Sequence, residues 1–230
     1  MEVYQFISEL EGYTPKIWRR FQVVKTISLA RLAYIVMAMY EMKAYHLLAI
    51  EYERPFLTAT GRQSKRMELI CRYDFPDSDL DGEEDGGGDA TQVRLSDMIL
   101  EAPYRLVVWY DFGDDWRVSV RLEKALDVPG LSARELPRVL EGEGFGILED
   151  CGGVCGLMDL AREFPAKGAE YEEYCAETGL RELNLAKFDL NDMNFRLKKI
   201  PGIFAKIYEQ HAAHSRRAID LIERKYLQKK

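Results

Sequence analysis

The fold is decided by the stretch Tyr104-Arg-Leu-Val-Val-Trp-Tyr110, Asp111-Phe-Gly-Asp-Asp115, Trp116-Arg-Val-Ser-Val-Arg-Leu-Glu123. Its first and last segments are rich in the β-branched and aromatic residues that favour strands. The middle segment contains Asp and Gly, which turns use because Asp bonds its own backbone and Gly tolerates a positive φ. Two strand-like runs joined by a short turn predict an antiparallel β-hairpin.

A second hairpin is predicted at the N-terminus. Residues 3–12 alternate enough for a strand, residues 12–15 contain the Gly and Pro of a turn, and residues 16–24 form the returning strand. Two further runs, 46–52 and 67–73, are rich in strand formers. The first of them also suits an extension of the preceding helix, but we expect two strands.

Helices are expected after the first hairpin and again in the C-terminal half. Ser28 is a suitable N-cap for a helix with Leu29, Leu32, Val36 and Met39 on one apolar stripe, and this helix is expected to cover the sheet. Beyond residue 129 the composition shifts toward helix. The later helices are expected at residues 153–164, 170–177, 191–199 and 201 to about 229.

These segments together predict an α+β fold, with an antiparallel sheet of hairpins, a covering helix and a helical C-terminal portion. We expect one domain over residues 1–197, followed by a basic amphipathic C-terminal helix over residues 198–230. The apolar stripe of that last helix contains Phe204, Tyr208 and Ile222.

The net charge of −7 is unevenly distributed along the 230 residues. Residues 74–90 contain eight acidic residues and no basic one, and the glycine-rich segment 75–90 is expected to be a mobile acidic loop with little to bury. Residues 196–230 contain ten Lys and Arg against three Asp and Glu. Residues 16–31 contain five basic residues and no acidic one, so the chain is expected to carry one acidic loop and two basic patches.

The composition, 47% hydrophobic and 31% charged, is that of a globular protein. The chain has no run of eighteen apolar residues and no basic, apolar leader at its N-terminus, so we expect a cytoplasmic protein that does not contact membranes. It also lacks the phosphate-loop, dinucleotide, serine-hydrolase and zinc-protease motifs. We therefore assign no cofactor and favour a protein that is not an enzyme.

Two acidic strings are the candidates for chemistry. Clustered carboxylates on a tight connection bind Mg²⁺ or Ca²⁺, but Asp and Gly in such places are also ordinary turn residues. The second string, which continues as Cys-Gly-Gly before a helix, is either a structural bend or a place where backbone N–H groups meet an anion. The candidate catalytic residues are Asp111, Asp114, Asp115, Glu149 and Asp150.

A histidine and several binding candidates complete the set. His46, at the start of an apolar run, is expected to be a boundary histidine with satisfied hydrogen bonds. Tryptophans beside arginines offer stacking surfaces for bases, and the basic C-terminal residues attract phosphates. The candidate binding residues are Trp18, Arg19, Arg20, Trp116, Gly152, Gly153, Arg216, Arg217, Arg224 and Lys225.

Three segments carry a resemblance to a known family: Ile17-Trp-Arg-Arg20 with Ser28-Leu-Ala-Arg-Leu32, Tyr110–Trp116, and Glu149–Gly153 with Gly156. In order and spacing they resemble the plasmid pRiA4b ORF-3-like proteins, which include passenger proteins of a bacterial insertion sequence. The resemblance extends from about residue 3 to about residue 197, with a weaker match at 188–194. It implies an α+β fold with an antiparallel sheet and an origin on mobile or plasmid DNA, but no defined activity.

The chain departs from this family at two places. Where relatives have Trp-x-His it has Trp116-Arg117-Val118, and where they have Cys-Pro-Pro it has Gly146-Ile147-Leu148. The residues it shares with the family are therefore acids, glycines and tryptophans rather than that histidine and that cysteine.

Three functions are expected in order of preference. The first is a non-enzymatic interaction module of a mobile element, which binds a protein partner, such as a host nuclease or defence complex, through its charged surfaces. The second is a Mg²⁺-dependent phosphodiesterase or nuclease, which requires the two acidic strings to converge. The third is a nucleic-acid-binding accessory protein that uses the basic C-terminal helix.

Overall fold

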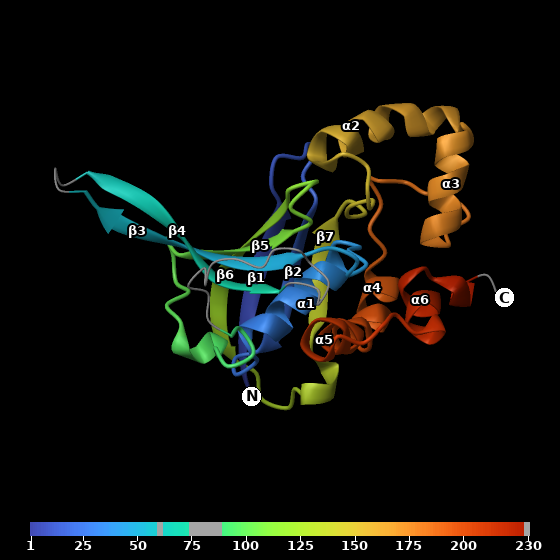
Figure 1. Cartoon of the computed structure of the whole chain (residues 1–230). Helices are drawn as coiled ribbons and strands as arrows, with labels where there is room; N and C mark the ends of the chain where they lie inside the picture. Colours follow the sequence, from blue (N-terminus) through green and yellow to red (C-terminus); the bar gives the residue numbers. More distant parts are fainter. Residues whose placement is uncertain (59–61, 74–88, 228–230) are drawn as a thin grey trace.

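The computed structural model describes residues 1–58, 62–73 and 89–227. The expected acidic loop, apart from residues 89 and 90, lies outside these described residues. The protein is built on a seven-stranded sheet in the order β4-β3-β5-β6-β1-β2-β7, in which every neighbouring pair is antiparallel (Figure 1). The strands are β1 (Glu2–Leu10), β2 (Trp18–Val24), β3 (Leu48–Leu57), β4 (Gln63–Tyr73), β5 (Arg105–Tyr110), β6 (Trp116–Asp127) and β7 (Arg138–Glu143).

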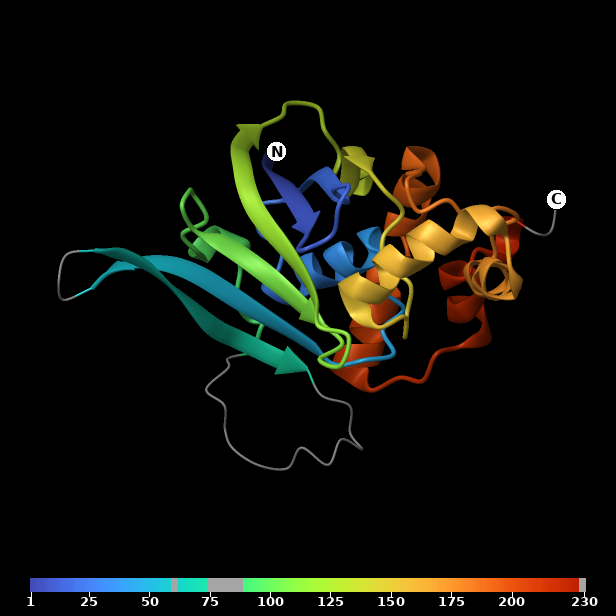
Figure 2. The ribbon, with the colours of Figure 1, turned by 90° about the horizontal axis from the view of Figure 1, so that it is seen from above.

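The helices gather mainly on the side of the sheet where β7 lies, while the β3–β4 hairpin projects from the opposite side (Figures 1 and 2). An antiparallel sheet with helices concentrated in the C-terminal half confirms the α+β prediction. The helices are α1 (Leu29–Met39), α2 (Gly153–Glu163), α3 (Ala169–Thr178), α4 (Leu190–Leu197), α5 (Ile200–Gln210) and α6 (Arg216–Ile222).

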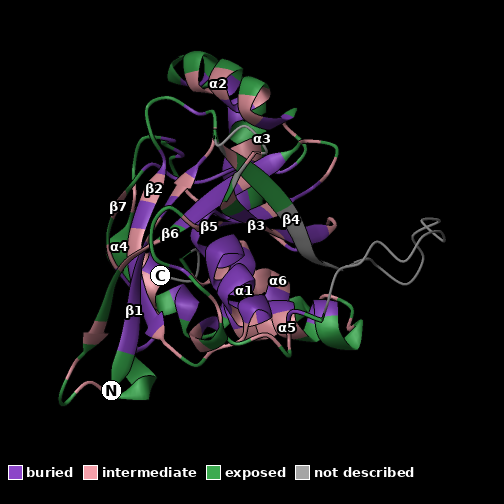
Figure 3. Ribbon diagram, turned by 90° about the vertical axis from the view of Figure 1, so that its left-hand side faces the viewer, coloured by how far each residue is buried: buried purple, intermediate pink, exposed green. Residues whose placement is uncertain are grey.

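Helix α1 is the centre of the core. Its N-cap is Ser28, as predicted, whose hydroxyl accepts a hydrogen bond from the Arg31 N–H at 3.2 Å. Every residue of α1 except Arg31 is buried, because one face packs on the sheet and the other on α5, where the rings of Tyr34 and Tyr208 stack 5.8 Å apart (Figure 3). The expected covering helix is therefore itself covered.

Two expectations about the C-terminal half are wrong. Strand β7 was not expected, because only Val139 of its six residues is buried and its remaining positions read as a polar loop. The single helix expected over residues 201 to about 229 is broken into α5 and α6. His211 takes a left-handed conformation there, and His214 leaves helical geometry to bond the Lys43 carbonyl at 3.0 Å.

Among the described residues, no helix combines the length and the apolar character that crossing a membrane would require.

Candidate metal centre

Three connections meet at one end of the sheet. They are the segment between α1 and β3, the turn between β5 and β6, and the segment between β7 and α2. Antiparallel pairing of β3 with β5 places Leu48 opposite Tyr110, so the residues just before β3 and just after β5 are neighbours. The Asp111 N–H donates to the Leu47 carbonyl at 3.0 Å and ties the first two connections together.

Asp111 is positioned by the turn that it begins. It adopts a φ of 53°, a left-handed conformation that Asp tolerates better than most residues. One carboxylate oxygen, Oδ1, accepts from the backbone N–H groups of Gly113 and Asp114 at 3.0 and 3.4 Å, as in an Asx turn. This leaves Oδ2 directed at the ring of His46, with 3.6 Å between Oδ2 and Nε2.

Glu149 is the buried carboxyl of the site, with a side chain only 3% exposed. Its Oε1 accepts from the Lys43 N–H at 2.6 Å and from the Tyr110 hydroxyl at 2.9 Å. Within the described part of the chain its Oε2 has no hydrogen-bond partner, and it lies 3.5 Å from His46 Nε2. Burial raises the pKa of Glu149 to about 7, although its hydrogen bonds oppose the rise.

His46 is the residue on which the carboxylates converge. Its ring meets that of Tyr110 edge-on, and its Nε2 is 3.4 Å from Oδ1 of Asp150, a side chain that is 77% exposed. That buried nitrogen has no hydrogen-bond partner among the described residues, so the expectation of a satisfied boundary histidine is wrong. Sequence reasoning missed His46 because its partners come from connections that only strand pairing brings near.

The spacing of these atoms fits a divalent cation. The ligand atoms of His46, Asp111 and Asp150 all lie within 4.8 Å of one another. Ligands bonded at about 2.1 Å in a tetrahedral site are about 3.4 Å apart, which matches the distances of 3.6 and 3.4 Å from His46 Nε2 to the Asp111 and Asp150 oxygens. One imidazole with two carboxylates suits Zn²⁺ or Mn²⁺ better than the Mg²⁺ expected from acids alone.

The other two predicted catalytic acids, Asp114 and Asp115, are paired with other groups. Asp114 Oδ2 accepts from the Gly152 N–H at 3.3 Å, which ties the β5–β6 turn to the start of α2. Asp115 is turned outward and pairs with Arg117 at 2.9 Å. The structure thus brings together three of the five acids, and a fourth supports the loop that carries Glu149 and Asp150.

The glycines of the second acidic string allow this close approach. Gly153 has a φ of +68°, and a Cβ there would lie 2.4 Å from the Asp114 carbonyl oxygen. A Cβ on Gly156 would lie 1.6 Å from the Cys151 carbonyl oxygen. Cys151 beside them is a poor nucleophile, because burial and the charge of Asp114 raise the pKa of its thiol to about 12. The string is a tightly packed bend that presents its acids to His46.

The part of the chain that holds these connections matches a family model. The model of the plasmid pRiA4b ORF-3-like protein aligns with residues 2–196. The chain belongs to this family. All four residues around the candidate cation position lie inside the matched range, whereas α5 and α6 lie beyond it.

Two relatives of the pRiA4b ORF-3-like chain are proteins without a described activity. Uncharacterized protein y4hQ of Sinorhizobium fredii (strain NBRC 101917 / NGR234) is 29% identical over 193 residues, which cover 79% of this chain and 88% of that protein. The crystal structure of MM3350, a protein of unknown function from Methanosarcina mazei Go1, is 28% identical, with a TM-score of 0.59. That alignment covers 83% of this chain and 97% of MM3350. The names of both relatives assign no activity.

Most predicted binding residues of this family member lie away from the centre. Trp116 is fully buried in the core, which leaves no ring face for a base. Arg19 is also fully buried, and its guanidinium donates to the carbonyls of Glu143, Gly144 and Phe145, so it holds β7 rather than a ligand. Arg20 lies beside Trp18 and pairs with Glu123 and Glu141.

The basic C-terminal residues divide into two groups. Arg216 and Arg217 are exposed on α6. Arg224 is buried between Glu41 and Asp192 at 2.6 and 2.8 Å, so its charge is used inside the protein. Lys225 pairs with Glu223 at 2.6 Å. The expected basic surface at this end is therefore smaller than the count of Lys and Arg suggests.

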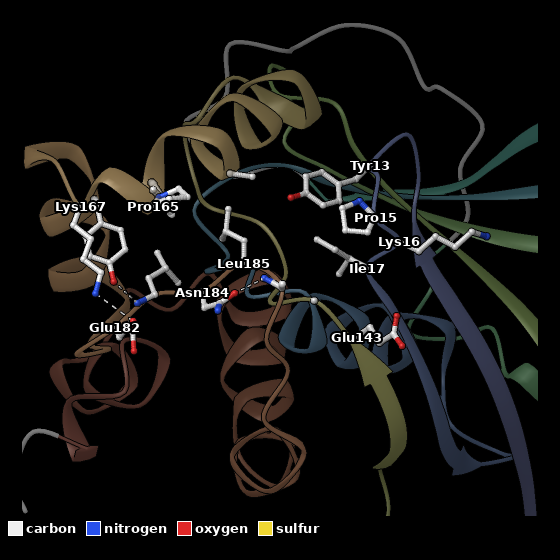
Figure 4. A pocket seen from close by; sticks show the side chains of 16 residues that line it. Tyr13, Pro15, Lys16, Ile17, Glu143, Pro165, Lys167, Glu182, Asn184 and Leu185 are labelled. Carbon is white, nitrogen blue, oxygen red and sulfur yellow. Dashed lines mark hydrogen bonds and ion pairs between the residues drawn. The ribbon is translucent and has the colours of Figure 1, made fainter.

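A cavity of about 520 Å³ lies apart from the centre, between the β1–β2 turn and the helices α2 and α3 (Figure 4). Three of the charged residues that line it are paired within the protein: Lys167 with Glu182 at 3.3 Å, and Lys16 with Glu9 at 2.9 Å. The Tyr171 hydroxyl accepts from the Leu183 N–H at 3.1 Å. The cavity offers an apolar hollow but not a convergent set of reactive groups.

Proposed function

We propose that this protein is a divalent-metal-dependent phosphodiesterase, with Zn²⁺ or Mn²⁺ held by His46, Asp111 and Asp150. The observation that supports it is the convergence of these three ligand atoms at metal-ligand spacing, beside the buried Oε2 of Glu149, which has no hydrogen-bond partner among the described residues. Three protein ligands leave a coordination position open for water, which is the arrangement of catalytic rather than structural metal sites.

Glu149 is the general base of the proposed reaction. A divalent cation brings the pKa of a bound water toward 7, and a neighbouring carboxylate can then accept the proton. With the cation bound, the water oxygen would attack phosphorus as Glu149 takes the water proton, the bond from phosphorus to the leaving oxygen would break, and that oxygen would take a proton from solvent. Solvent reaches the site on the side of Asp150, which is exposed. An open position of this kind suits an extended polymer such as a nucleic-acid backbone.

The protein-binding module that we expected first from the sequence stays a prediction. The phosphodiesterase expected as an alternative is favoured here because its stated condition, convergence of the two acidic strings, is met by Asp111, Glu149 and Asp150. The cation differs from the one first expected, since the added imidazole favours Zn²⁺ or Mn²⁺.

The proposal is tested by calorimetric titration of the metal-free protein with Zn²⁺ and with Mn²⁺, followed by cleavage assays on bis(p-nitrophenyl) phosphate and labelled DNA. Asp111→Asn should weaken metal binding and abolish cleavage. Glu149→Gln should keep metal binding and lower the cleavage rate about 10²–10⁴-fold, because it removes only the base.

Asp115→Asn is the matched control, since Asp115 lies in the same turn but pairs with Arg117 outside the centre. This variant should bind metal and cleave like the parent protein. Wild-type protein that takes up neither cation, or an Asp111→Asn variant that binds it equally well, would refute the proposed centre. Metal binding without cleavage of either substrate would refute the phosphodiesterase.

A further inference from the structure

The β3–β4 hairpin extends beyond the rest of the sheet as a two-stranded ribbon (Figures 1 and 2). We call its outer part, residues 54–58 and 62–67, the basic arm. By sequence these residues include Arg54, Arg62, Lys65 and Arg66 and no acidic residue. All four basic residues are exposed, and the arm therefore carries a positive charge away from a protein that is acidic overall.

One face of the basic arm combines charge with an aromatic ring. Arg54 lies directly opposite Arg66 in the strand register, and Phe56 lies opposite Ser64. Because side chains alternate along a strand, these four residues share one face. Phe56 is 44% exposed, and Met67 on the other face is 39% exposed. Arginines on either strand beside an exposed ring are suited to phosphates and bases rather than to the interior of a protein.

The second face is anchored to the body. Lys65 pairs with Glu53 at 2.7 Å, and Glu53 also pairs with Arg105 of β5 at 2.8 Å. The base of the ribbon is thus held to β5 by the pair of Glu53 with Arg105, while Arg62 and Arg66 are exposed on its outer part.

Strand β3 connects the candidate metal centre to the basic arm. Strand β3 begins at Leu48, two residues after His46, and leads outward to Arg54. At about 3.3 Å per residue, Arg54 and the opposite Arg66 lie about 26 Å from His46, and Arg62, which pairs with Thr58 farther out, lies about 40 Å from it. Duplex DNA rises about 3.4 Å per base pair, so a duplex lying along the strand would span about eight to twelve base pairs between these arginines and the metal centre.

We infer that the basic arm enters the major groove of duplex DNA and positions a phosphodiester at the metal centre, about eight to twelve base pairs from the phosphates that the arm contacts. The groove is about 12 Å wide and admits a two-stranded ribbon. Arg62 and Arg66 contact phosphates, and the exposed ring of Phe56 contacts bases. This inference rests on the proposed function for its account of cleavage, but the binding step is independent of any metal.

The test is fluorescence anisotropy with labelled duplex DNA of about 20 base pairs, in EDTA so that no cleavage occurs, across a series of salt concentrations. The double variant Arg62→Gln with Arg66→Gln should lower the affinity about tenfold and reduce the slope of log K against log salt by about two, one for each lost phosphate contact. Both side chains are exposed, so the melting temperature should not change.

The matched control is the double variant Arg216→Gln with Arg217→Gln, which removes the same charge from the exposed face of α6. It should bind duplex DNA like the parent protein. An equal loss in both double variants would overturn the inference in favour of general electrostatic attraction or of the C-terminal helices. No loss in the arm variant, or equally tight binding of single strands, would also overturn it.

The length of the duplex tests the binding role of the arm separately from cleavage at the metal centre. With Zn²⁺ or Mn²⁺ present, duplexes shorter than about eight base pairs should be cleaved poorly because they do not span the distance from the arm to His46. DNA binding that depends on the arm, without cleavage, would refute the phosphodiesterase activity but not the DNA-binding role of the arm. Cleavage of bis(p-nitrophenyl) phosphate without arm-dependent DNA binding would refute the DNA-binding role of the arm but not the phosphodiesterase activity.

Discussion

Glu149 is the group whose protonation should govern the stability of the metal-free protein. Its carboxyl is almost fully buried, and its two hydrogen-bond donors, the Lys43 N–H and the Tyr110 hydroxyl, both serve Oε1. Burial raises the pKa of Glu149 from its ordinary value of 4.5 to about 7. The folded protein therefore keeps a proton that the unfolded chain gives up.

The direction and size of the effect follow from proton linkage. Between pH 4.5 and about pH 7 the folded state binds more protons than the unfolded state, so the free energy of unfolding falls as the pH rises. At about 1.4 kcal/mol per pH unit, the contribution of Glu149 to this loss is about 3 kcal/mol. Stability from this group is fully present below pH 4.5 and is lost by about pH 7.

The assay is urea unfolding in EDTA at several pH values between 4.5 and 8, with Glu149→Gln and the control Glu177→Gln. The neutral amide removes the titration. Relative to the parent protein, the free energy of unfolding of Glu149→Gln should therefore rise by about 3 kcal/mol as the pH increases across this range. Glu177 is exposed and pairs with Lys43 nearby, so its variant should follow the parent profile. Parallel profiles for the parent protein and Glu149→Gln would refute this account. Saturating Zn²⁺ should restore stability at pH 8, because it binds the folded state and favours the charged carboxyl.

Three further predictions concern residues that support the site or the core. Glu41→Gln should destabilise the protein by about 3 kcal/mol in urea unfolding, because it leaves the buried charges of Arg196 and Arg224 without their shared partner, whereas Glu177→Gln should not. Gly153→Ala should cost about 2 kcal/mol in thermal unfolding and weaken calorimetric Zn²⁺ binding, since the added Cβ displaces the turn beside it; an unchanged affinity would contradict the role assigned to that contact. Ser28→Ala should cost about 1 kcal/mol through loss of the α1 cap, and Ser28→Asn should recover most of it.

Glu41 illustrates a part of the core that periodicity does not reveal. Burial alone would raise its pKa, but the charges and hydrogen bonds of Arg196 and Arg224 outweigh burial and hold the pKa below its usual value. In the sequence these three residues belong to three separate segments, and Arg224 reads as part of a solvated basic helix. A buried charge is stable only with a partner close by, and a sequence does not show which partner the tertiary structure will supply.

The local elements were predictable because their signals are local. The hairpin of β5 and β6 follows from two β-rich runs around an Asp- and Gly-containing turn, and the start of α1 follows from Ser28 before an apolar stripe. The acids Asp111, Glu149 and Asp150 were also candidates from the sequence, because clustered carboxylates beside glycines are typical of turns and of metal sites. Strand β7 was missed because an edge strand with one buried residue carries almost no periodic signal.

The amino-acid sequence by itself determined the α+β class, the β1–β2 and β5–β6 hairpins, the cap of α1 and the identity of the acidic strings, since each depends on residues close together in the chain. Only the tertiary structure decided that β3 inserts between β4 and β5, which sets His46 beside Asp111 and directs the basic arm away from the body. It also decided that Arg19 and Arg224 are interior charges. The physical reason is that strand order and burial depend on packing between distant segments, whereas propensity and capping act within a few residues.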